Sequence, residues 1–596
     1  MQDMVGERAP AGRAAAGGLP RHVRMFLRLS RRELPAPVCG IAVERGTEVP
    51  AGDGVPLLTD HYAPLLAGPA PTLLVRTPYG RGFPWDYVYG ALFAGQGFHV
   101  VIQSCRGTGG SGGEFEPFVQ EAADGQAAVA WLRGQDWFSG ALGTVGASYL
   151  GFTQWALALD PPPELGAMIV QVSADDFYGF LYPGGALALE PILVGAAGML
   201  SMHRGAGHFA LAIARLLRHR RRAERTLPLL DAYRPAAGQR VAWLERWLAH
   251  PAPGDPFWVS RRVIAASAER IPPASLLTGW WDVCLDQTLA QYQRLRAAGR
   301  PVRLVVGPWT HTSGFSQDMP VLLGEALRWL RAYLAGDRGA LPAQPVRVHV
   351  SETGGPGEWR DLPDWPPPHA APRSWHLHGD GTLAADPPGA AAVSSFRYDP
   401  AAPTPSVGGP SMDASNYGSR RNGALEARSD VLTFTGPVLS EPLEVMGPVS
   451  VRLRVSGSGP HFDVFARLCD VDPRGRSWNV CDGLLRLGGG STAAAADGAP
   501  GGEADGETGG GGPEGAVAGG GWQDITVPMS ATAHRFGAGH RIRLQLSGGA
   551  HPRFMRNTGT GEPLATATRL VPVDIRIRHD PAHPGVLTLT ADGVPR

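Results

Sequence analysis

Short apolar runs alternate with helical segments along residues 40–172 of this 596-residue chain. PTLLVRTPYG and GFHVVIQSCRG are typical of buried strands that end in loops, and EAADGQAAVAWLRGQ is typical of a helix. The alternation stops near residue 173 and resumes with PPASLLTGWWDVCLD, QTLAQYQRLRAAG and PVRLVVGPWTHT. Strands that alternate with helices form a parallel sheet, so the pattern predicts an α/β domain that carries an insertion.

The rest of the chain has two other sequence patterns. Residues 173–263 look helical throughout, which predicts a helical cap. The later runs VSVRLRVSG, FDVFARLCDV and HRIRLQLSG have period 2 and are separated by turns, which indicates a β-sandwich or jelly roll. The expected parts are a flexible extension over 1–40, an α/β domain over 41–172 and 264–368, the cap over 173–263, and a β domain over 369–596. A stretch poor in large apolar groups, 488–521, predicts a disordered loop.

The amino-acid composition argues against several classes of function. The formal net charge is zero and 43% of residues are hydrophobic, which favours a globular protein and gives no support to nucleic-acid or membrane-surface binding. The basic run 218–225 is interpreted as a solvated helix face. Lysine is absent, which excludes Schiff-base and P-loop lysine chemistry. Five scattered cysteines without a CxxC pair indicate neither a zinc knuckle nor a disulfide framework, and a reducing cytoplasm is expected.

The stretch LGTVGASYLGF places Ser148 between an apolar strand-like run and a helix-capable run. A nucleophilic serine on a sharp strand-to-helix turn needs small neighbours because the backbone there is crowded, and Gly146 fits that need. The match to G-x-S-x-G is imperfect, since Tyr149 and Leu150 precede Gly151. A serine among glycines is weak evidence by itself, and an ordinary loop is the alternative. The nucleophile hypothesis needs an acid and a histidine later in the chain.

Both partners follow, each just past a predicted strand end. Asp282 ends SLLTGWWD and His311 follows VRLVVGPWT, so the order is Ser, Asp, His. Asp282 could instead cap a helix, and Asp286, which we expect one turn into that helix, competes as the acid. Because the carboxyl ends of parallel strands share one edge of a sheet, the three residues are predicted to meet there. His311 would take the proton of Ser148, and Asp282 would fix the tautomer of His311.

An acyl-transfer site also needs donors for the oxyanion. The backbone amide of Tyr149, directly after the nucleophile, is one candidate. The loop in VRTPYGRG offers the Tyr79 hydroxyl as the second, with a packed loop aromatic as the equal alternative. CRGTGGSGGEF lacks the lysine and helix context of a phosphate loop and is interpreted as a tight turn.

Five motifs in order, RTPYGRG, RGTGGSGGEF, GASYLG, GWWDVCLD and GPWTH, resemble those of the CocE/NonD hydrolases, relatives of cocaine esterase, Xaa-Pro dipeptidyl-peptidases (S15) and α-amino acid ester hydrolases. YDPAAPTPSVGG and FDVFARLCDVDPRGRSWNVCDG are similar to that family's C-terminal β domain, so the resemblance covers nearly the whole chain. It implies an α/β-hydrolase core, an inserted helical cap and a C-terminal jelly roll of the galactose-binding-like type.

Carried over residue by residue, the resemblance implies Ser148 as nucleophile, Asp282 as acid and His311 as base. It also implies Tyr79 and Tyr149 as oxyanion donors, and its own form G-x-S-Y-x-G matches this sequence. Trp280 and Trp281, beside the acid, are predicted to line the acyl pocket, although tryptophan pairs more often serve packing.

The sequence departs from the family at one subsite. α-Amino acid ester hydrolases bind the substrate's ammonium with carboxylates, some of them just after the acid, where this chain has Val283, Cys284 and Leu285. Asp175 and Asp176 could supply negative charge instead, but helix capping is the favoured interpretation.

The sequence therefore predicts a serine hydrolase that cleaves carboxylic esters or activated amides through an acyl-enzyme, without metal or organic cofactor. Its partner is expected to be a small-molecule ester or amide, and assembly into a homo-oligomer is left open. Two alternatives remain: an Xaa-Pro dipeptidyl-peptidase or acyl-amino-acid amidase, and a catalytically inert carbohydrate-binding protein.

Overall fold

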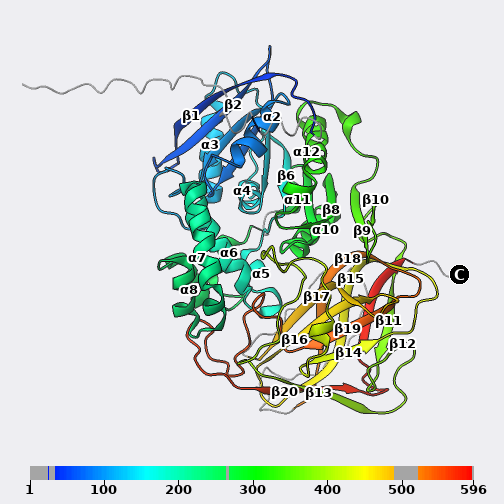
Figure 1. The fold of residues 1–596 in the computed structure, drawn as a ribbon. Coiled ribbons are helices and arrows are strands. Elements are labelled where there is room, and N and C mark those ends of the chain that lie inside the picture. The colour runs from blue at the N-terminus through cyan, green and yellow to red at the C-terminus, as the bar shows by residue number, and fades with distance from the viewer. Residues whose placement is uncertain (1–24, 26–33, 264–266, 489–520, 593–596) are drawn as a thin grey trace, which may run out of the picture.

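The computed structural model describes residue 25 and residues 34–263, 267–488 and 521–592. Figure 1 shows an α/β part in blue to green, a group of helices beside it, and a β-rich part in yellow to red. Most of the predicted N-terminal extension, 1–40, and nearly all of the predicted loop, 488–521, lie outside the described residues.

One long sheet organises the α/β part. Its six central pairings, β4–β3, β3–β5, β5–β6, β6–β7, β7–β8 and β8–β9, are parallel. The pairings at the two edges, β1–β2 and β2–β4 at one and β9–β10 at the other, are antiparallel. In spatial order the strands are β1 (Gly40–Pro50), β2 (Pro56–Leu65), β4 (His99–Ser104), β3 (Thr72–Thr77), β5 (Leu142–Ala147), β6 (Leu165–Gln171), β7 (Ala274–Trp281), β8 (Val302–Thr310), β9 (Val346–Glu352) and β10 (Glu358–Leu362). The strands predicted around LLVRT, HVVIQS, MIVQ, LLTGWW and RLVVGPW all form in this sheet.

Helices cover both faces of this sheet, which explains why β3, β4 and β5 are buried along their whole length. The helices are η2 (Asp86–Ala91), α2 (Leu92–Ala94), α3 (Glu121–Arg133), α4 (Tyr149–Leu157), α10 (Leu285–Ala297), α11 (Gly314–Gln317) and α12 (Met319–Leu334). The predicted helices around EAADGQAAVAWLR and QTLAQYQRLRA correspond to α3 and α10. The α/β domain predicted from the alternation and the α/β-hydrolase-type core implied by the resemblance are both confirmed.

Between β6 and β7 the chain leaves the sheet and forms helices. These are α5 (Phe177–Leu181), α6 (Leu189–Ser201), α7 (Ala206–Arg225), α8 (Leu229–Ala237) and α9 (Ala242–Ala249). Figure 1 shows α5, α6, α7 and α8 below α3, next to the β-rich part. Only Leu216 and Ala223 of α7 are buried, and Arg218, Arg221 and Arg222 are exposed, as expected for a solvated basic face.

The C-terminal part is β-rich, as predicted, and consists of two packed sheets. One contains β11 (Ala370–Leu377), β12 (Leu383–Ala384), β13 (Ala392–Tyr398), β15 (Leu443–Gly457), β18 (Gln523–Phe536), β20 (Val573–His579) and β21 (Val586–Asp592). The other contains β14 (Val431–Thr435), β19 (Arg541–Ser547), β16 (Phe462–Val471) and β17 (Ser477–Leu487), with α13 (Gly423–Glu426) before β14. Alternating apolar residues of both sheets, among them Val451, Phe462 and Leu544, form one core. The jelly-roll topology stays a prediction.

Two histidines face each other on the second and third strands of the α/β sheet. His61 Nε2 and His99 Nδ1 are 2.9 Å apart, and Trp137 stacks on both rings at centroid distances of 4.0 and 4.7 Å. Burial, and to a smaller degree the neighbouring His99, lowers the pKa of His61 from 6.5 to about 3. The folded chain therefore keeps His61 neutral at pH values where the unfolded chain protonates it.

This difference predicts a loss of stability in mild acid. His61 binds fewer protons in the folded state, so the free energy of unfolding should fall as pH decreases from 6.5 towards 3, by about 2 kcal/mol for this one group at pH 5. Urea unfolding at pH 7.5 and 5.0 measures the difference. A His61→Phe variant should show a correspondingly smaller difference, whereas His208→Phe, at an exposed position, should behave like the parent chain. An unchanged pH dependence in His61→Phe would contradict the assignment.

Candidate active site

Ser148 occupies a sharp turn between β5 and α4. Its backbone angles, φ 58° and ψ −122°, are strained for a residue with a side chain, and such strain is concentrated at functional sites. A Cβ on Gly146 would lie 2.4 Å from Cβ of Leu150, and one on Gly151 would lie 2.4 Å from Cβ of Ser173. The turn therefore needs both glycines, which accounts for the small residues around the serine in the sequence.

The three residues predicted from strand ends lie in hydrogen-bond contact. His311 Nε2 is 3.0 Å from Ser148 Oγ, and His311 Nδ1 is 2.8 Å from Asp282 Oδ1. His311 is 8% exposed and Asp282 1%, so water is largely excluded from their contact. The arrangement lets the imidazole accept the serine proton while the carboxylate stabilises the resulting cation.

The carboxylate of Asp282 is held by groups of its own strand and loop. Thr278 Oγ1 donates to Oδ2 at 2.7 Å, and the amide of Cys284 donates to Oδ1 at 3.1 Å. The competing acid, Asp286, lies in the first turn of α10 and accepts instead from Ser530 Oγ at 3.0 Å. Of the two candidate acids, Asp282 is therefore the one in contact with His311.

The two predicted oxyanion donors also meet at the serine. The Tyr79 hydroxyl interacts with the side chain of Ser148 and the backbone amide of Tyr149. Burial raises the pKa of Tyr79 to about 12, and these hydrogen bonds oppose the rise only partly, so the hydroxyl remains a proton donor at neutral pH. Arg81 fixes the Tyr79 loop by donating to Ser104 Oγ at 2.7 Å and to the Gly109 carbonyl at 2.9 Å.

Gly109 belongs to the glycine-rich segment that the sequence analysis interpreted as a tight turn. Gly107, Gly109, Gly110 and Gly113 all have positive φ. A Cβ on Gly107 would lie 2.3 Å from the backbone nitrogen of Phe115, so the turn requires glycine there. The segment supports the loop of Tyr79.

One group among the described residues has the spacing of metal ligands: atoms of Asp282, Cys284 and His311 lie within 4.8 Å of one another. Two of these side chains are already hydrogen-bonded to each other. Burial, together with the charge of Asp282, raises the pKa of the Cys284 thiol well above its usual value, which disfavours the thiolate that binds metals. The donor set therefore fits a proton relay better than a metal centre.

The two tryptophans beside the acid have different surroundings. The indole N–H of Trp280 donates to the His349 carbonyl at 2.7 Å, and its ring lies 5.3 Å from that of Trp365. Trp280 is thus engaged in packing near β9, while Trp281 is only partly buried. Lining of the acyl pocket by the pair stays a prediction.

The interpretation of Asp175 and Asp176 as helix caps was wrong. Asp176 precedes α5, but its side chain makes no capping hydrogen bond and instead pairs with Arg262 at 3.0 Å. Asp175 pairs with Arg294. Opposite charges elsewhere in the chain engage both carboxylates, so neither is available to an amine without breaking an ion pair.

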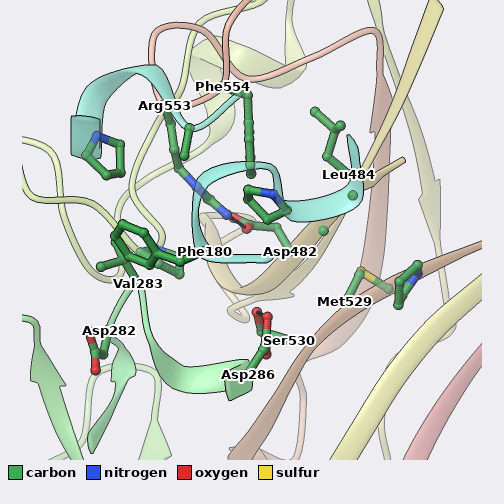
Figure 2. A pocket seen from close by; sticks show the side chains of 17 residues that line it. Phe180, Asp282, Val283, Asp286, Asp482, Leu484, Met529, Ser530, Arg553 and Phe554 are labelled. Atoms are coloured by element: carbon green, nitrogen blue, oxygen red, sulfur yellow. Dashed lines mark hydrogen bonds and ion pairs between the residues drawn. The ribbon is translucent and has the colours of Figure 1, made fainter. Parts of the chain in front are cut away.

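A cavity of about 290 Å³ lies where the α/β part, the cap and the β-rich part meet (Figure 2). Asp282, Val283 and Asp286 form one wall. The other walls are mainly apolar and come from distant segments, with Phe180, Leu484, Met529 and Phe554 among them. Sequence reasoning missed these wall residues because nothing in a single sequence signals which loops of separate domains converge.

The β-rich wall is braced by a buried charge cluster. Asp482 accepts from Arg467 Nη2 at 2.9 Å and from Arg553 Nη2 at 2.6 Å. Although burial opposes it, the two guanidinium groups hold the pKa of Asp482 below its usual value. A paired, ionised cluster fixes the loop that carries Phe554 against the cavity.

The helices in the described part of the chain are all too short or too polar to cross a lipid bilayer.

Sequence comparison detects two adjacent regions. Residues 53–313 match the X-Pro dipeptidyl-peptidase (S15 family), and residues 339–588 match the X-Pro dipeptidyl-peptidase C-terminal non-catalytic domain. The chain is similar to a cocaine esterase of Rhodococcus sp. (strain MB1 Bresler), at 31% identity over 92% of this chain and 98% of the relative.

Two solved structures share the fold. An aminopeptidase from a marine sediment Thaumarchaeota archaeon superposes with a TM-score of 0.73 at 21% identity, over 93% of this chain and 97% of that one. An α-amino acid ester hydrolase gives a TM-score of 0.73 at 22% identity, over 94% of this chain and 98% of that one.

Proposed function

The chain belongs to the S15 family of X-Pro dipeptidyl-peptidases and CocE/NonD-type hydrolases, and we propose that it performs serine hydrolysis with Ser148, His311 and Asp282. It is a serine hydrolase that acts on small-molecule ester or amide substrates. The observation that carries the residue assignment is the continuous hydrogen-bond chain from Ser148 Oγ through His311 to Asp282.

The proposed reaction has two halves. Ser148 Oγ attacks the substrate carbonyl as His311 Nε2 takes its proton, and the Tyr79 hydroxyl and Tyr149 amide stabilise the tetrahedral oxyanion. His311 then protonates the leaving group, which departs and leaves the acyl group on Ser148. Water, deprotonated by His311, attacks the acyl-enzyme, and the proton returned from His311 to Ser148 Oγ restores the enzyme.

A carboxylic ester is the proposed substrate class. The 31%-identical relative is a cocaine esterase, and the largely apolar walls around Val283, Met529 and Phe554 suit an apolar or aromatic acyl group. Comparing an aryl ester with an Ala-Pro chromogenic amide tests this assignment. Faster hydrolysis of the amide would favour the dipeptidyl-peptidase. The assembled triad gives no support to an inert carbohydrate-binding protein.

One observation favours the amine-recognising alternative. Asp286 lines the cavity next to Val283, and its hydrogen-bond donor there, Ser530, is neutral. Desolvation at the cavity wall raises the pKa of Asp286, although Ser530 and the charge of Arg553 oppose the rise, and a cationic ligand beside it would restore the ionised form. Asp286 could therefore bind the free amine of an amino ester or peptide from a position one helical turn after the acid.

This alternative predicts a selective effect of Asp286→Asn. The substitution keeps the size of the side chain and removes its charge, so kcat/KM for an α-amino aryl ester should fall about 10-fold more than for the same ester without the amine. Steady-state kinetics on the matched pair of esters measures the ratio. Val283→Ala is the control, since it changes the same cavity without changing charge. Equal effects on both esters would remove Asp286 from amine recognition.

We also propose a cytoplasmic location, because all five cysteines are free thiols, as in proteins of reducing compartments. Assembly into a homo-oligomer stays a proposal that size-exclusion chromatography with light scattering would test.

A further inference from the structure

Tyr149 extends in two directions from the nucleophile. Its amide lies at the Tyr79 hydroxyl, whereas its side chain points into the core and is only 3% exposed. The phenol donates to Glu121 Oε1 at 2.8 Å and accepts from the amide of Phe118 at 2.9 Å. Burial, reinforced by the charge of Glu121, raises the pKa of Tyr149 well above its usual value, so the phenol stays protonated and keeps donating.

Glu121 is in turn held by an arginine from β3. Arg76 Nη1 lies 2.9 Å from Glu121 Oε2 and donates to the Glu121 carbonyl at 2.7 Å. Arg76 Nε also donates to Gln103 Oε1 at 3.0 Å, and the exposure of Arg76 and Glu121 is 2% and 3%. Arg76 lies near the end of β3, and Tyr79 follows three residues later in the loop after that strand. The ion pair of Arg76 and Glu121 is therefore connected to both proposed oxyanion donors: to Tyr149 through its phenol, and to Tyr79 along the chain.

We propose that the buried Arg76–Glu121 pair is a positioning element of the oxyanion site, acting on the Tyr149 amide through the Tyr149 phenol. This inference rests on the proposed function, because it presumes that the Tyr149 amide stabilises the oxyanion. Glu121 and Arg76 do not touch the substrate, and their effect passes through Tyr149.

The local backbone makes such an anchor necessary. Tyr149 follows the strained Ser148 and is the first residue of α4, so its amide has no partner within the helix and its direction depends on the turn. Anchoring the far end of the ring limits rotation of the residue about this turn. A hydrogen-bond donor stabilises a transition state fully only when it is oriented before the reaction begins.

Phe118 adds a second constraint. It has a positive φ of 68°, an unfavourable conformation for an aromatic residue, and its amide points at the Tyr149 phenol. Its ring stacks on Tyr149 at 4.5 Å and on Phe177 of α5 at 4.0 Å. The anchor of Tyr149 is thereby also packed against the cap.

Removing only the phenol oxygen tests the inference. Tyr149→Phe should lower kcat about 10-fold and leave KM within about twofold, because a misdirected donor weakens the transition state and not substrate binding. Affinity for a boronic acid, which forms a tetrahedral adduct on Ser148, should fall by the same factor as kcat/KM. Tyr292→Phe is the matched control: Tyr292 is also fully buried and donates to a carboxylate, Asp364, at 2.8 Å, but on α10.

The outcomes separate this inference from the proposed function. An unchanged kcat in folded Tyr149→Phe, or the same loss in Tyr292→Phe, would overturn the positioning role. Inactive Ser148→Ala beside fully active Tyr149→Phe would remove only the positioning role, whereas active Ser148→Ala would remove the proposed function itself. A Glu121→Gln variant gives a second test of the positioning role, since its amide oxygen can still accept a hydrogen bond from the Tyr149 phenol. It should retain more activity than Glu121→Leu once thermal unfolding has shown both to be folded.

Discussion

Replacing Ser148 by alanine is expected to lower kcat by a factor of about 10³ to 10⁶, with KM changed little. In the proposed mechanism Ser148 Oγ is the only triad atom that forms a bond to the substrate, so any residual rate would come from the oxyanion donors and binding. The smaller loss, about 10³-fold, is expected if water attacks the bound ester directly in the variant. Steady-state hydrolysis of an aryl ester measures the loss.

A fluorophosphonate probe provides the companion measurement. It should label the parent chain at Ser148 and leave Ser148→Ala unlabelled, as read by mass spectrometry of the peptide around GASYLG. Ser139→Ala is the matched control, because that serine is exposed and hydrogen-bonded to the Ala70 carbonyl, away from the triad. A Ser148→Ala protein that folds and keeps most of its activity would disprove the mechanism.

The second large effect concerns the acid. Asp282→Asn should lower kcat by about 10⁴-fold while leaving the fold intact, since an amide can present its N–H to His311 and favour the wrong tautomer. His311 Nε2 would then carry the proton and could not accept another from Ser148. The pH–rate profile and kcat on an aryl ester are the measurements.

Another histidine–carboxylate contact supplies the control. His250 Nδ1 lies 2.7 Å from Asp255 Oδ2 in the cap, so Asp255→Asn changes the same chemistry at a different place. That variant should keep kcat within about threefold. If Asp282→Asn lost no more activity than Asp255→Asn, the carboxylate partner of His311 would have no catalytic role.

The order of strands and helices could be predicted because its physical cause is local. Buried parallel strands such as LLVRT and HVVIQS need continuous apolar runs, and the glycines around Ser148 are required by contacts within a few residues. The meeting of Ser148, Asp282 and His311 followed from one topological rule, that parallel strands end at one sheet edge. These features needed no knowledge of how distant segments pack.

The cavity and the ion pairs could not be predicted from the sequence, because they depend on contacts between segments that are distant in the chain. Asp175 and Asp176 looked like helix caps because Arg294 and Arg262, which pair with them, are more than 80 residues away in the chain. The sequence likewise does not reveal that the indole of Trp280 donates to the His349 carbonyl. Each depends on tertiary contacts that no local pattern encodes.

The walls of the cavity come from the α/β part, the cap and the β-rich part, while the residues of the proposed triad all come from the α/β part. Changes at Met529 or Phe554 can therefore reshape the cavity, and with it the proposed acyl-group site, without altering the strands that carry Ser148 and His311. If the cavity holds the acyl group as proposed, substitutions in the C-terminal sandwich would change substrate selectivity while the residues of the proposed chemistry stay constant.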